Sequence, residues 1–402
     1  MRTRHIFVWL ITLIFSAVLS GCGEVSQKET EAESDGQPHK IGVLVYNLAD
    51  EEVLSFRNYL ENYIGECFPD VEFLYSDSVA DEEGIQAFLT TAHENGVEGI
   101  MSFLSYDLEA EVTTCEEYGM YYLMASGTVP EESFAKVQDN PYFLGVVGPG
   151  TQIEYQAGKE MAEYFIEETS GDSYLIYSGG AAQGNEMHRI RTLAILTTLQ
   201  DSYGTTFDVP ADALALTEEP VTVQSGDLAI CVYPGYVRMD GVREGAAKEL
   251  NSGAYDSAMA VLPVGPLVEE AGRVNIPLGT IDAYTEGNQL LFNNGRLDYV
   301  TGKYSSIIGP SFAAMYNAVK GYAEDFRQDG KAFQVTQGFW SSSDAEDYAE
   351  KYSLASSISV NAYNYEDLQH VCKDYNPDAS LEELISLAGA YTYEDALARR
   401  GQ

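Results

Sequence analysis

The chain has 402 residues and a formal net charge of −41, with 63 acidic against 22 basic side chains. A charge this negative excludes nucleic acid as a partner, because the phosphate backbone would be repelled rather than neutralised. With 45% hydrophobic and 21% charged residues the composition is that of a globular protein, and the length suits two domains of ordinary size.

The first residues have the pattern of a bacterial lipoprotein signal. A basic start precedes an apolar run from Ile6 to Val18, which is shorter than the about 20 residues that a membrane span needs. The sequence Leu19-Ser20-Gly21-Cys22 then resembles a lipobox, in which the cysteine receives a lipid and the preceding peptide is removed. We therefore expect residues 1–21 to be a signal peptide and Cys22 to be the lipidation site. An ordinary secretory signal and a short N-terminal anchor are the alternatives.

The lipid would decide where the protein works. An acidic body gains nothing from an anionic membrane surface, so attachment must come from the lipid on Cys22. Residues 22–39 are polar and rich in Glu and Ser, and we expect them to form a flexible tether. The predicted location is outside the cytoplasm, on the bacterial cell membrane.

No motif in the sequence indicates a metal site, a cofactor or catalysis. The remaining cysteines have no CxxC spacing, which argues against zinc. They lie in helix-like and strand-like segments, which favours buried free thiols over disulfides. The glycine-rich turn from Gly179 to Gly184 lacks the GxGxxG spacing and the Lys-Ser/Thr pair of phosphate loops. GxSxG, HExxH and calcium-loop patterns are also absent from the sequence. We therefore expect a protein that is not an enzyme and has no cofactor.

Apolar strands alternate with amphipathic helices along most of the chain. Continuous apolar strands of this kind form a parallel sheet covered on both faces, and right-handed crossovers make it doubly wound. The first group of predicted strands is Ile41–Tyr46, Val71–Tyr75, Val97–Phe103, Tyr121–Ala125 and Phe143–Val147. After Pro149-Gly150 the alternation restarts with Tyr174–Tyr177, Leu228–Val232, Ser257–Leu262, Pro277–Ile281 and Leu297–Val300. A long helix is predicted over Ile307–Phe326. The sequence predicts two α/β lobes.

The order of these segments resembles the type I periplasmic binding proteins, the ribose- and galactose-binding group that serves ABC transporters. Four segments in the family order carry the resemblance: Glu154–Ala162, Arg189-Ile190-Arg191, Arg238-Met239-Asp240-Gly241 and Leu278–Asp282. The resemblance covers roughly residues 40–339. It implies two doubly wound parallel-sheet lobes joined by a three-segment hinge.

The resemblance also implies how the chain is divided. Residues 40–149 and 304–338 would form the N-terminal lobe, and residues 150–303 and 339–354 the C-terminal lobe. The three crossings would lie near Gly148–Thr151, Gly302–Tyr304 and Gly338–Ser343. Residues 355–402 are aromatic and helical in pieces, and we expect this C-terminal extension to pack on the lobes.

Ligand-binding residues follow from the family positions and from the ends of predicted strands. The expected ligand contacts are Asp50, Glu52, Asp107, Ser126, Arg191, Tyr236, Asp282 and Lys303. Arg191 would supply a fork of donors, with Arg189 as the competing arginine, and Asp282 would accept hydroxyls. Asp50 and Glu52 can alternatively cap the helix that follows them.

The chain departs from the family at two places. Asp50, Glu52 and Val53 stand where the family has an asparagine and stacking aromatics, and Pro263-Val264-Gly265 replaces an expected asparagine. The ligand class therefore stays open between a sugar or sugar-like compound and a nucleoside or other polar metabolite.

The function implied by the resemblance is that of a lipid-anchored solute-binding protein. It would close two lobes on a small molecule and deliver that molecule, as a monomer, to an ABC permease in the membrane. A sensory receptor that presents the closed lobes to a chemoreceptor or histidine kinase uses the same closure and is the alternative from a different class.

Overall fold

The computed structural model describes residues 37–183, 185–236, 239–272, 276–357 and 361–401. Cys22, Gly184 and Arg238 lie outside the described residues, so the lipidation site stays a prediction. No helix in the described ranges is long and apolar enough to cross a membrane. The four cysteines that follow the predicted signal, Cys67, Cys115, Cys231 and Cys372, are all buried.

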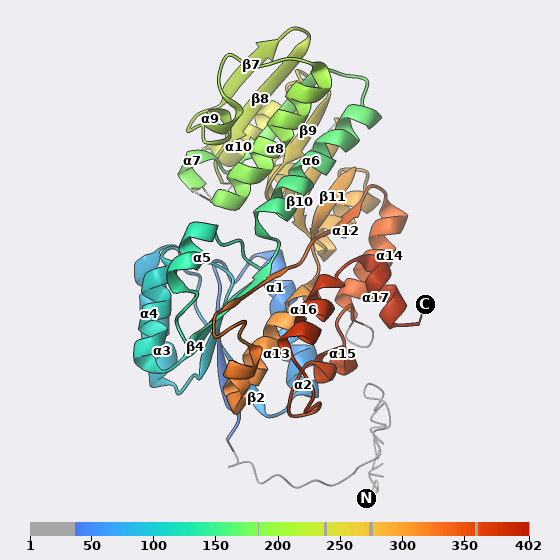
Figure 1. Cartoon of the computed structure of the whole chain (residues 1–402). Helices are drawn as coiled ribbons and strands as arrows, with labels where there is room; N and C mark the ends of the chain where they lie inside the picture. Colours follow the sequence, from blue (N-terminus) through green and yellow to red (C-terminus); the bar gives the residue numbers. More distant parts are fainter. Residues whose placement is uncertain (1–36, 184, 237–238, 273–275, 358–360, 402) are drawn as a thin grey trace, which may run out of the picture. The chain divides into compact units, whose positions relative to one another are not determined.

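The first lobe is built on a six-stranded parallel sheet with the strand order β12-β5-β4-β3-β1-β2 (Figure 1). Its strands are β1 (His39–Leu44), β2 (Val71–Tyr75), β3 (Gly99–Ser102), β4 (Tyr121–Ala125), β5 (Phe143–Gly148) and β12 (Phe333–Thr336). Its helices are α1 (Glu51–Asn58), continued by η1 (Tyr59–Ile64) and α2 (Gly65–Cys67), then α3 (Glu82–Glu94), α4 (Leu108–Tyr118), α5 (Glu131–Val137) and α13 (Gly309–Asn317).

Alternation along the strands covers both faces of this sheet. Leu44 packs in one apolar cluster with Phe88 of α3 and Val112 of α4. Its neighbour Val43 belongs to the other cluster, together with Phe56 of α1. Successive side chains of a strand point to opposite faces, so helices cover both sides, as the apolar strands predicted.

The second lobe is built on a seven-stranded sheet with the order β13-β11-β10-β9-β6-β8-β7. Its strands are β6 (Ser173–Ser178), β7 (Val221–Ser225), β8 (Leu228–Pro234), β9 (Ser257–Ala260), β10 (Leu278–Ala283), β11 (Tyr299–Lys303) and β13 (Trp340–Ser342). The edge strands β7 and β13 are antiparallel to their neighbours. The helices are α6 (Gly150–Glu168), α7 (Gly180–Gln183), α8 (Glu186–Tyr203), α9 (Ala211–Ala215), α10 (Val242–Leu250), α11 (Gly265–Ala271) and α12 (Glu286–Asn293).

One predicted helix is broken in the structure. The expected helix Ile307–Phe326 is divided into η2 (Ser305–Ile308), α13, η3 (Ala318–Tyr322) and η4 (Ala323–Phe326). Pro310 stands at the start of α13, where its missing N–H is tolerated. Gly321 adopts a φ of 89° inside η3, a conformation that ends helical geometry and that glycine accepts without strain.

Two of the crossings between the sheets are packed against each other. Tyr304 follows β11 and Trp340 begins β13, and their rings stack with centroids 3.9 Å apart at an interplanar angle of 17°. The carbonyl oxygen of Tyr391 accepts hydrogen bonds from the Tyr304 hydroxyl at 3.0 Å and from the Trp340 indole N–H at 2.8 Å. A side chain at Gly338 would come within 2.4 Å of the Tyr391 ring. Close packing therefore requires glycine at this crossing.

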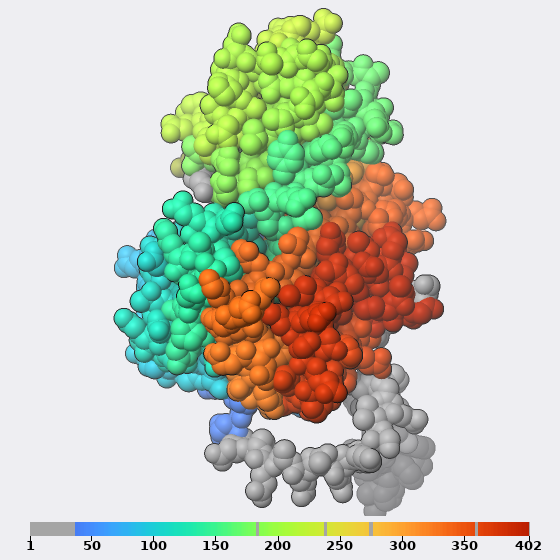
Figure 2. Space-filling model, in the orientation of Figure 1, coloured from blue at the N-terminus to red at the C-terminus, as the bar shows by residue number. Residues whose placement is uncertain are grey.

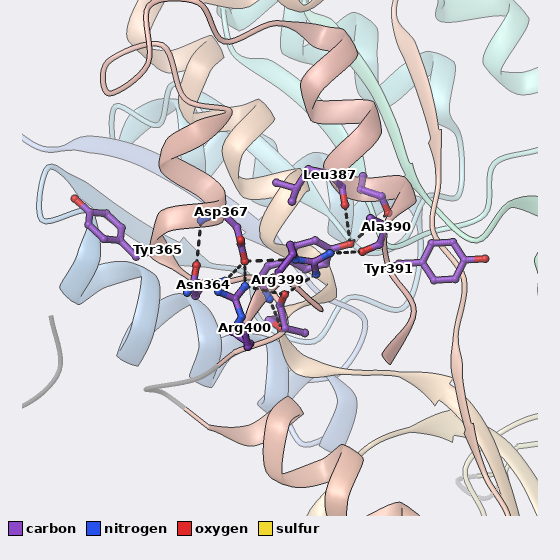
Figure 3. Close-up of polar contacts among 12 residues, drawn as sticks. Asn364, Tyr365, Asp367, Leu387, Ala390, Tyr391, Arg399 and Arg400 are labelled. Carbon is purple, nitrogen blue, oxygen red and sulfur yellow. Dashed lines mark hydrogen bonds and ion pairs between the residues drawn. The ribbon is translucent and has the colours of Figure 1, made fainter. Parts of the chain in front are cut away.

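The C-terminal segment consists of α14 (Ala345–Ser356), α15 (Tyr365–His370), α16 (Leu381–Gly389) and α17 (Tyr393–Arg399). Figure 3 shows the polar contacts that hold the last three together: Asp367 pairs with Arg400 and, at 3.7 Å, with Arg399. Arg399 donates to the Ala390 carbonyl, and its guanidinium lies 4.7 Å from the centroid of the Tyr363 ring.

This segment packs on the rest of the body. The Tyr59 hydroxyl donates to the Tyr363 carbonyl at 2.7 Å, and the Asn317 amide donates to the Val371 carbonyl at 2.8 Å. In Figure 2 the red C-terminal residues lie against the orange residues that precede them in sequence. The segment is therefore bonded both to the first lobe and to two crossings.

The contacts of Trp340 predict a graded loss of stability. Trp340→Phe keeps an aromatic ring but removes the indole donor, and should lower the free energy of unfolding by about 1 kcal/mol. Trp340→Ala also removes the stack, and should cost about 3–5 kcal/mol. Urea unfolding measures both variants. The control Tyr106→Ala truncates an exposed ring and should change stability by less than about 0.5 kcal/mol. Equal stability of all three would show that the stack contributes nothing.

Candidate functional site

Polar side chains gather where strands of both sheets end. Tyr46 follows β1, Ser126 follows β4 and Ser178 ends β6, while Asp282 is the last residue but one of β10 and Lys303 ends β11. In parallel α/β sheets ligands bind at the carboxyl ends of the strands. These strand ends therefore define the candidate ligand site.

An ion pair connects the two sheets at this position. Lys303 is 7% exposed, and its Nζ lies 3.1 Å from Oε1 of Glu52 in the first turn of α1. A buried ammonium requires such a partner, because breaking a buried pair costs about 3–5 kcal/mol. The structure thus brings two of the predicted site residues together, from opposite lobes.

Asp50 caps α1 as well as lying at the site. Its Oδ1 accepts hydrogen bonds from the Glu52 N–H at 3.0 Å and from the Tyr46 hydroxyl at 3.0 Å. Burial, and then the charge of Glu52, raise the pKa of the Asp50 carboxyl. The helix-capping role that the sequence left open for Asp50 is therefore present. A ligand bound by Asp50 would share its carboxylate with the Glu52 N–H and the Tyr46 hydroxyl.

Asp282 is the most strongly perturbed acid of the site. Its Oδ2 accepts a hydrogen bond from the Asn288 amide at 2.8 Å. Burial, opposed by the hydrogen bond from Asn288 and aided by the charges of Asp50, Glu52 and Glu51, raises the pKa of Asp282 to about 8. A carboxyl group with this pKa is largely protonated near neutrality, so it can donate a hydrogen bond as well as accept one.

Arg191 is held by groups of its own lobe. Its Nε lies 2.5 Å from Oε2 of Glu154 on α6, and Nη1 donates to the Val261 carbonyl at 2.9 Å. The guanidinium also lies 5.7 Å from the centroid of the Phe339 ring. Arg191 is thus a buried link between α8, α6 and the end of β9. The competing arginine, Arg189, pairs with Glu186 and Asp212 instead.

His188 is a site residue that the sequence analysis missed. It is 7% exposed, and its Nδ1 has no hydrogen-bond partner among the described residues. Burial, and after it the charges of Arg191 and Lys303, lower the pKa of His188 to about 3. The imidazole is therefore neutral. Its spacing of three residues before Arg191 on one helix face is the signal that could have drawn attention to it.

The remaining predicted residues differ in their placement. Ser126 is buried with a φ of 59°, and its Oγ has no hydrogen-bond partner among the described residues. Tyr236 follows β8 and is close enough to Tyr46 and Tyr177 to raise the pKa of each, after burial. Asp107 is exposed and its carboxylate caps α4 by accepting from the Ala110 N–H at 3.2 Å. The contacts of Asp107 are thus local to its own helix.

Several buried hydroxyls at the strand ends share one property. Within the described ranges the hydroxyls of Tyr177, Ser178 and Ser126 are buried without a hydrogen-bond partner. An unsatisfied buried polar group costs about 1–3 kcal/mol, so each such group requires an explanation. Hydrogen bonds to a polar ligand would satisfy these groups. No group of three or more His, Cys, Asp or Glu side chains in the described part of the chain could hold a metal ion.

Comparison with known proteins identifies the fold. No protein-family model matches the chain, and no curated protein matches it. Among solved structures, an ABC transporter solute-binding protein from Bacillus halodurans C-125 with bound myo-inositol is similar, at 17% identity and a TM-score of 0.57. The match covers 79% of this chain and 99% of that protein.

Two further structures agree with this match. A galactofuranose-binding protein matches at 13% identity and a TM-score of 0.56, over 80% of this chain and all of that protein. The periplasmic component of the arabinose ABC transporter from Shewanella sp. ANA-3, bound to α- and β-L-arabinofuranose, matches at 12% identity and a TM-score of 0.55. That match covers 78% of this chain and 94% of that protein.

These similarities confirm the fold class that the sequence predicted. The chain has the fold of the type I periplasmic binding proteins, with two α/β lobes and additional C-terminal helices. Its structural neighbours include solute-binding proteins of ABC transporters and a galactofuranose-binding protein.

The raised pKa of Asp282 predicts a pH-dependent difference in stability. Because this pKa is about 8 in the folded protein and about 3.9 in an unfolded chain, protonation favours the fold. That contribution is complete below a pH of about 4 and is lost as the pH rises through about 8. Asp282→Asn cannot ionise, so its melting temperature should rise relative to wild type between pH values of about 5 and 8.

Thermal unfolding across this range tests the expectation. Asp107→Asn, which replaces an exposed carboxylate at a helix cap, is the matched control. The difference between its melting temperature and that of wild type should stay constant with pH. A pH-independent difference in melting temperature between Asp282→Asn and wild type would contradict a raised pKa at this position.

Proposed function

We propose that this protein is an extracytoplasmic solute-binding protein that delivers a sugar or sugar-like small molecule to an ABC importer by closure of its two lobes. The observation that carries the proposal is the meeting of polar side chains from strand ends of both sheets, joined by the Glu52–Lys303 ion pair. The proposed lobes are residues 40–149 with 304–338 and residues 150–303 with 339–354, with the extension 355–402 packed on them.

The chemistry of the site favours a ligand rich in hydroxyl groups. A protonated Asp282 can donate and accept, a neutral His188 can do the same, and the hydroxyls of Ser126 and Ser178 are available to either role. Rings of Tyr46 and Tyr236 can pack against the apolar face of a sugar. The ligands named for the three similar structures, myo-inositol, galactofuranose and arabinofuranose, are all polyhydroxylated.

The sequence leaves two alternative functions. Acidic groups at Asp50 and Glu52 replace the stacking pair of the family, which leaves room for a nucleoside or another polar metabolite. A sensory receptor ectodomain that signals to a chemoreceptor or kinase would use the same closure and transport nothing. Loss of sugar uptake on deletion of the gene supports import, and unchanged uptake supports the receptor.

A thermal-shift panel of sugars, cyclic polyols, nucleosides and amino acids on the purified protein tests the ligand class. A ligand at 100 times its Kd should stabilise the fold by about 2.7 kcal/mol, which raises the melting temperature measurably. Tyr236→Ala should then weaken binding of the stabilising sugar about tenfold by losing a ring contact. Tyr155→Ala removes a ring from α6 and is the control, with unchanged Kd expected. Stabilisation by nucleosides alone would overturn the sugar assignment.

Arg191 is a poor site for a binding test, although the sequence alone recommends it. Arg191→Ala would leave Glu154, which is fully buried, without its cation, and loss of one partner of a buried pair destabilises by about 3–5 kcal/mol. Reduced binding in that variant would then report unfolding. Tyr236 avoids this difficulty because it is only half-buried.

We also propose that the protein is attached to the cell membrane by a lipid on Cys22. Cys22→Ser should move the protein from the membrane fraction to the soluble fraction, because the chain is strongly acidic and no helix in its described ranges could span a membrane. Fractionation and immunoblotting of cells measure this. Cys67→Ser leaves the signal intact and is the control. Retention of Cys22→Ser in membranes would indicate an uncleaved anchor.

A further inference from the structure

A second cavity lies outside the candidate ligand site. It has a volume of about 300 Å³ and is bounded by α1, η1, the start of α12 and the end of α14. None of Asp50, Glu52, Asp282 and Lys303 lines it. We name it the hinge pocket, because Ser305, next to the crossing residue Tyr304, forms part of its wall. A volume of this size is at the lower end of the range for small-molecule sites.

We propose that the hinge pocket binds a small organic ammonium ion between the carboxylates of Glu51 and Glu286 and the rings of its tyrosines. Its ligand would be distinct from the ligand of the candidate site, so the proposal stands apart from the proposed function. The argument depends on the cavity, on what its aromatic walls offer, and on the sign of its charges.

The tyrosines in the wall offer ring surface rather than hydroxyl groups. The hydroxyl of Tyr59 donates to the Tyr363 carbonyl at 2.7 Å, and that of Tyr63 accepts from the Tyr365 N–H at 2.8 Å. The hydroxyl of Tyr284 is bonded to Ser342 at 2.7 Å. These three hydroxyls are engaged elsewhere, and the three side chains are only 3%, 7% and 1% exposed. The ring surface open to a ligand therefore belongs mainly to Tyr352, which is partly exposed. Aromatic surface attracts cations through its π electrons.

The charges around the cavity have one sign. Glu51 and Glu286 line it, and among the described residues of its wall there is no lysine, arginine or histidine. Both glutamates also raise the pKa of Tyr352, after burial, which places their negative charge beside this fourth ring. An anion would therefore be repelled, and a cation would meet two carboxylates and the ring of Tyr352.

The same features favour an organic cation over a bare metal ion. No group of three or more acidic, histidine or cysteine side chains in the described ranges could hold a metal, and divalent cations prefer six or more oxygen ligands. An ammonium ion that carries methyl or methylene groups instead gains from contact with ring carbon as well as from charge. The walls thus match the ligand in both polarity and apolar character.

The position of the pocket gives the bound cation a defined structural effect. Glu51 belongs to α1 of the first lobe, and its carboxylate accepts a hydrogen bond from the Gly287 N–H of α12 in the second lobe at 3.2 Å. Glu286 is the first residue of that same helix. A cation between the two carboxylates would offset their mutual repulsion and bind to both lobes at once.

Isothermal titration calorimetry of the full chain in detergent, with choline chloride as the probe, tests the proposal. Wild type should give saturable binding of one choline per chain. Glu286→Gln should weaken this binding about tenfold by removing one carboxylate. Glu382→Gln neutralises an exposed glutamate in the first turn of α16 and is the matched control, with unchanged affinity expected. Tyr352→Leu should weaken binding while keeping every charge.

Three results would overturn the proposal. The first is the absence of saturable choline binding in wild type. The second is an equal loss of choline affinity in Glu286→Gln and Glu382→Gln. The third is wild-type choline affinity in both single variants, Tyr352→Leu and Glu286→Gln. Equal weakening would mean that choline is attracted to the acidic surface in general. Melting temperatures of the variants without choline show that each is folded, and the sugar panel on the same samples reports the candidate site separately.

Discussion

The ion pair between Lys303 and Glu52 is the interaction on which the candidate site depends. It places a buried ammonium between two sheets and requires the first turn of α1 to face the end of β11. The pair is neutral in sum, and the carboxyl groups of Asp50 and Asp282 beside it add negative charge to the region. The chain has only 22 basic side chains against 63 acidic ones, so cations to balance this charge are few. Protonation of Asp282, whose pKa is raised, reduces the negative charge instead.

The fold could be predicted from the sequence wherever strands are buried on both faces. Continuous apolar runs such as Ile41–Tyr46 indicate a central parallel strand without knowledge of its neighbours. The strands β7 and β13 were not predicted, because edge strands are partly exposed and do not have this apolar pattern. The break at Gly321 was also missed, since a single glycine is tolerated in many helices and its φ is set by tertiary packing.

A residue of the candidate site could be predicted where its position along a strand places it in the site. It could not be predicted where a partner far away in the sequence places it there. Asp282 was predicted from its place at a strand end and Lys303 from a family position at a crossing, and both lie at strand ends in the structure. The partner of Arg191 is 37 residues away in sequence, and that of Lys303 is 251 residues away. Side-chain pairs at such separations have no spacing that a sequence displays. The charge of Lys303 beside His188 comes from a strand 115 residues further along the chain, and only the spacing to Arg191 on the same helix could have been read from the sequence.

The carbonyl of Tyr391 has a consequence for movement of the lobes. It accepts from Tyr304 and Trp340, whose rings stack, so the second and third crossings form a single stiff strip. The first crossing has no part in these contacts, and its Gly150 has a φ of 62° that only glycine adopts freely. Two crossings that bend together leave one axis of rotation rather than several. We therefore expect lobe motion in this protein to be a one-dimensional swing in which twisting of one sheet over the other is suppressed.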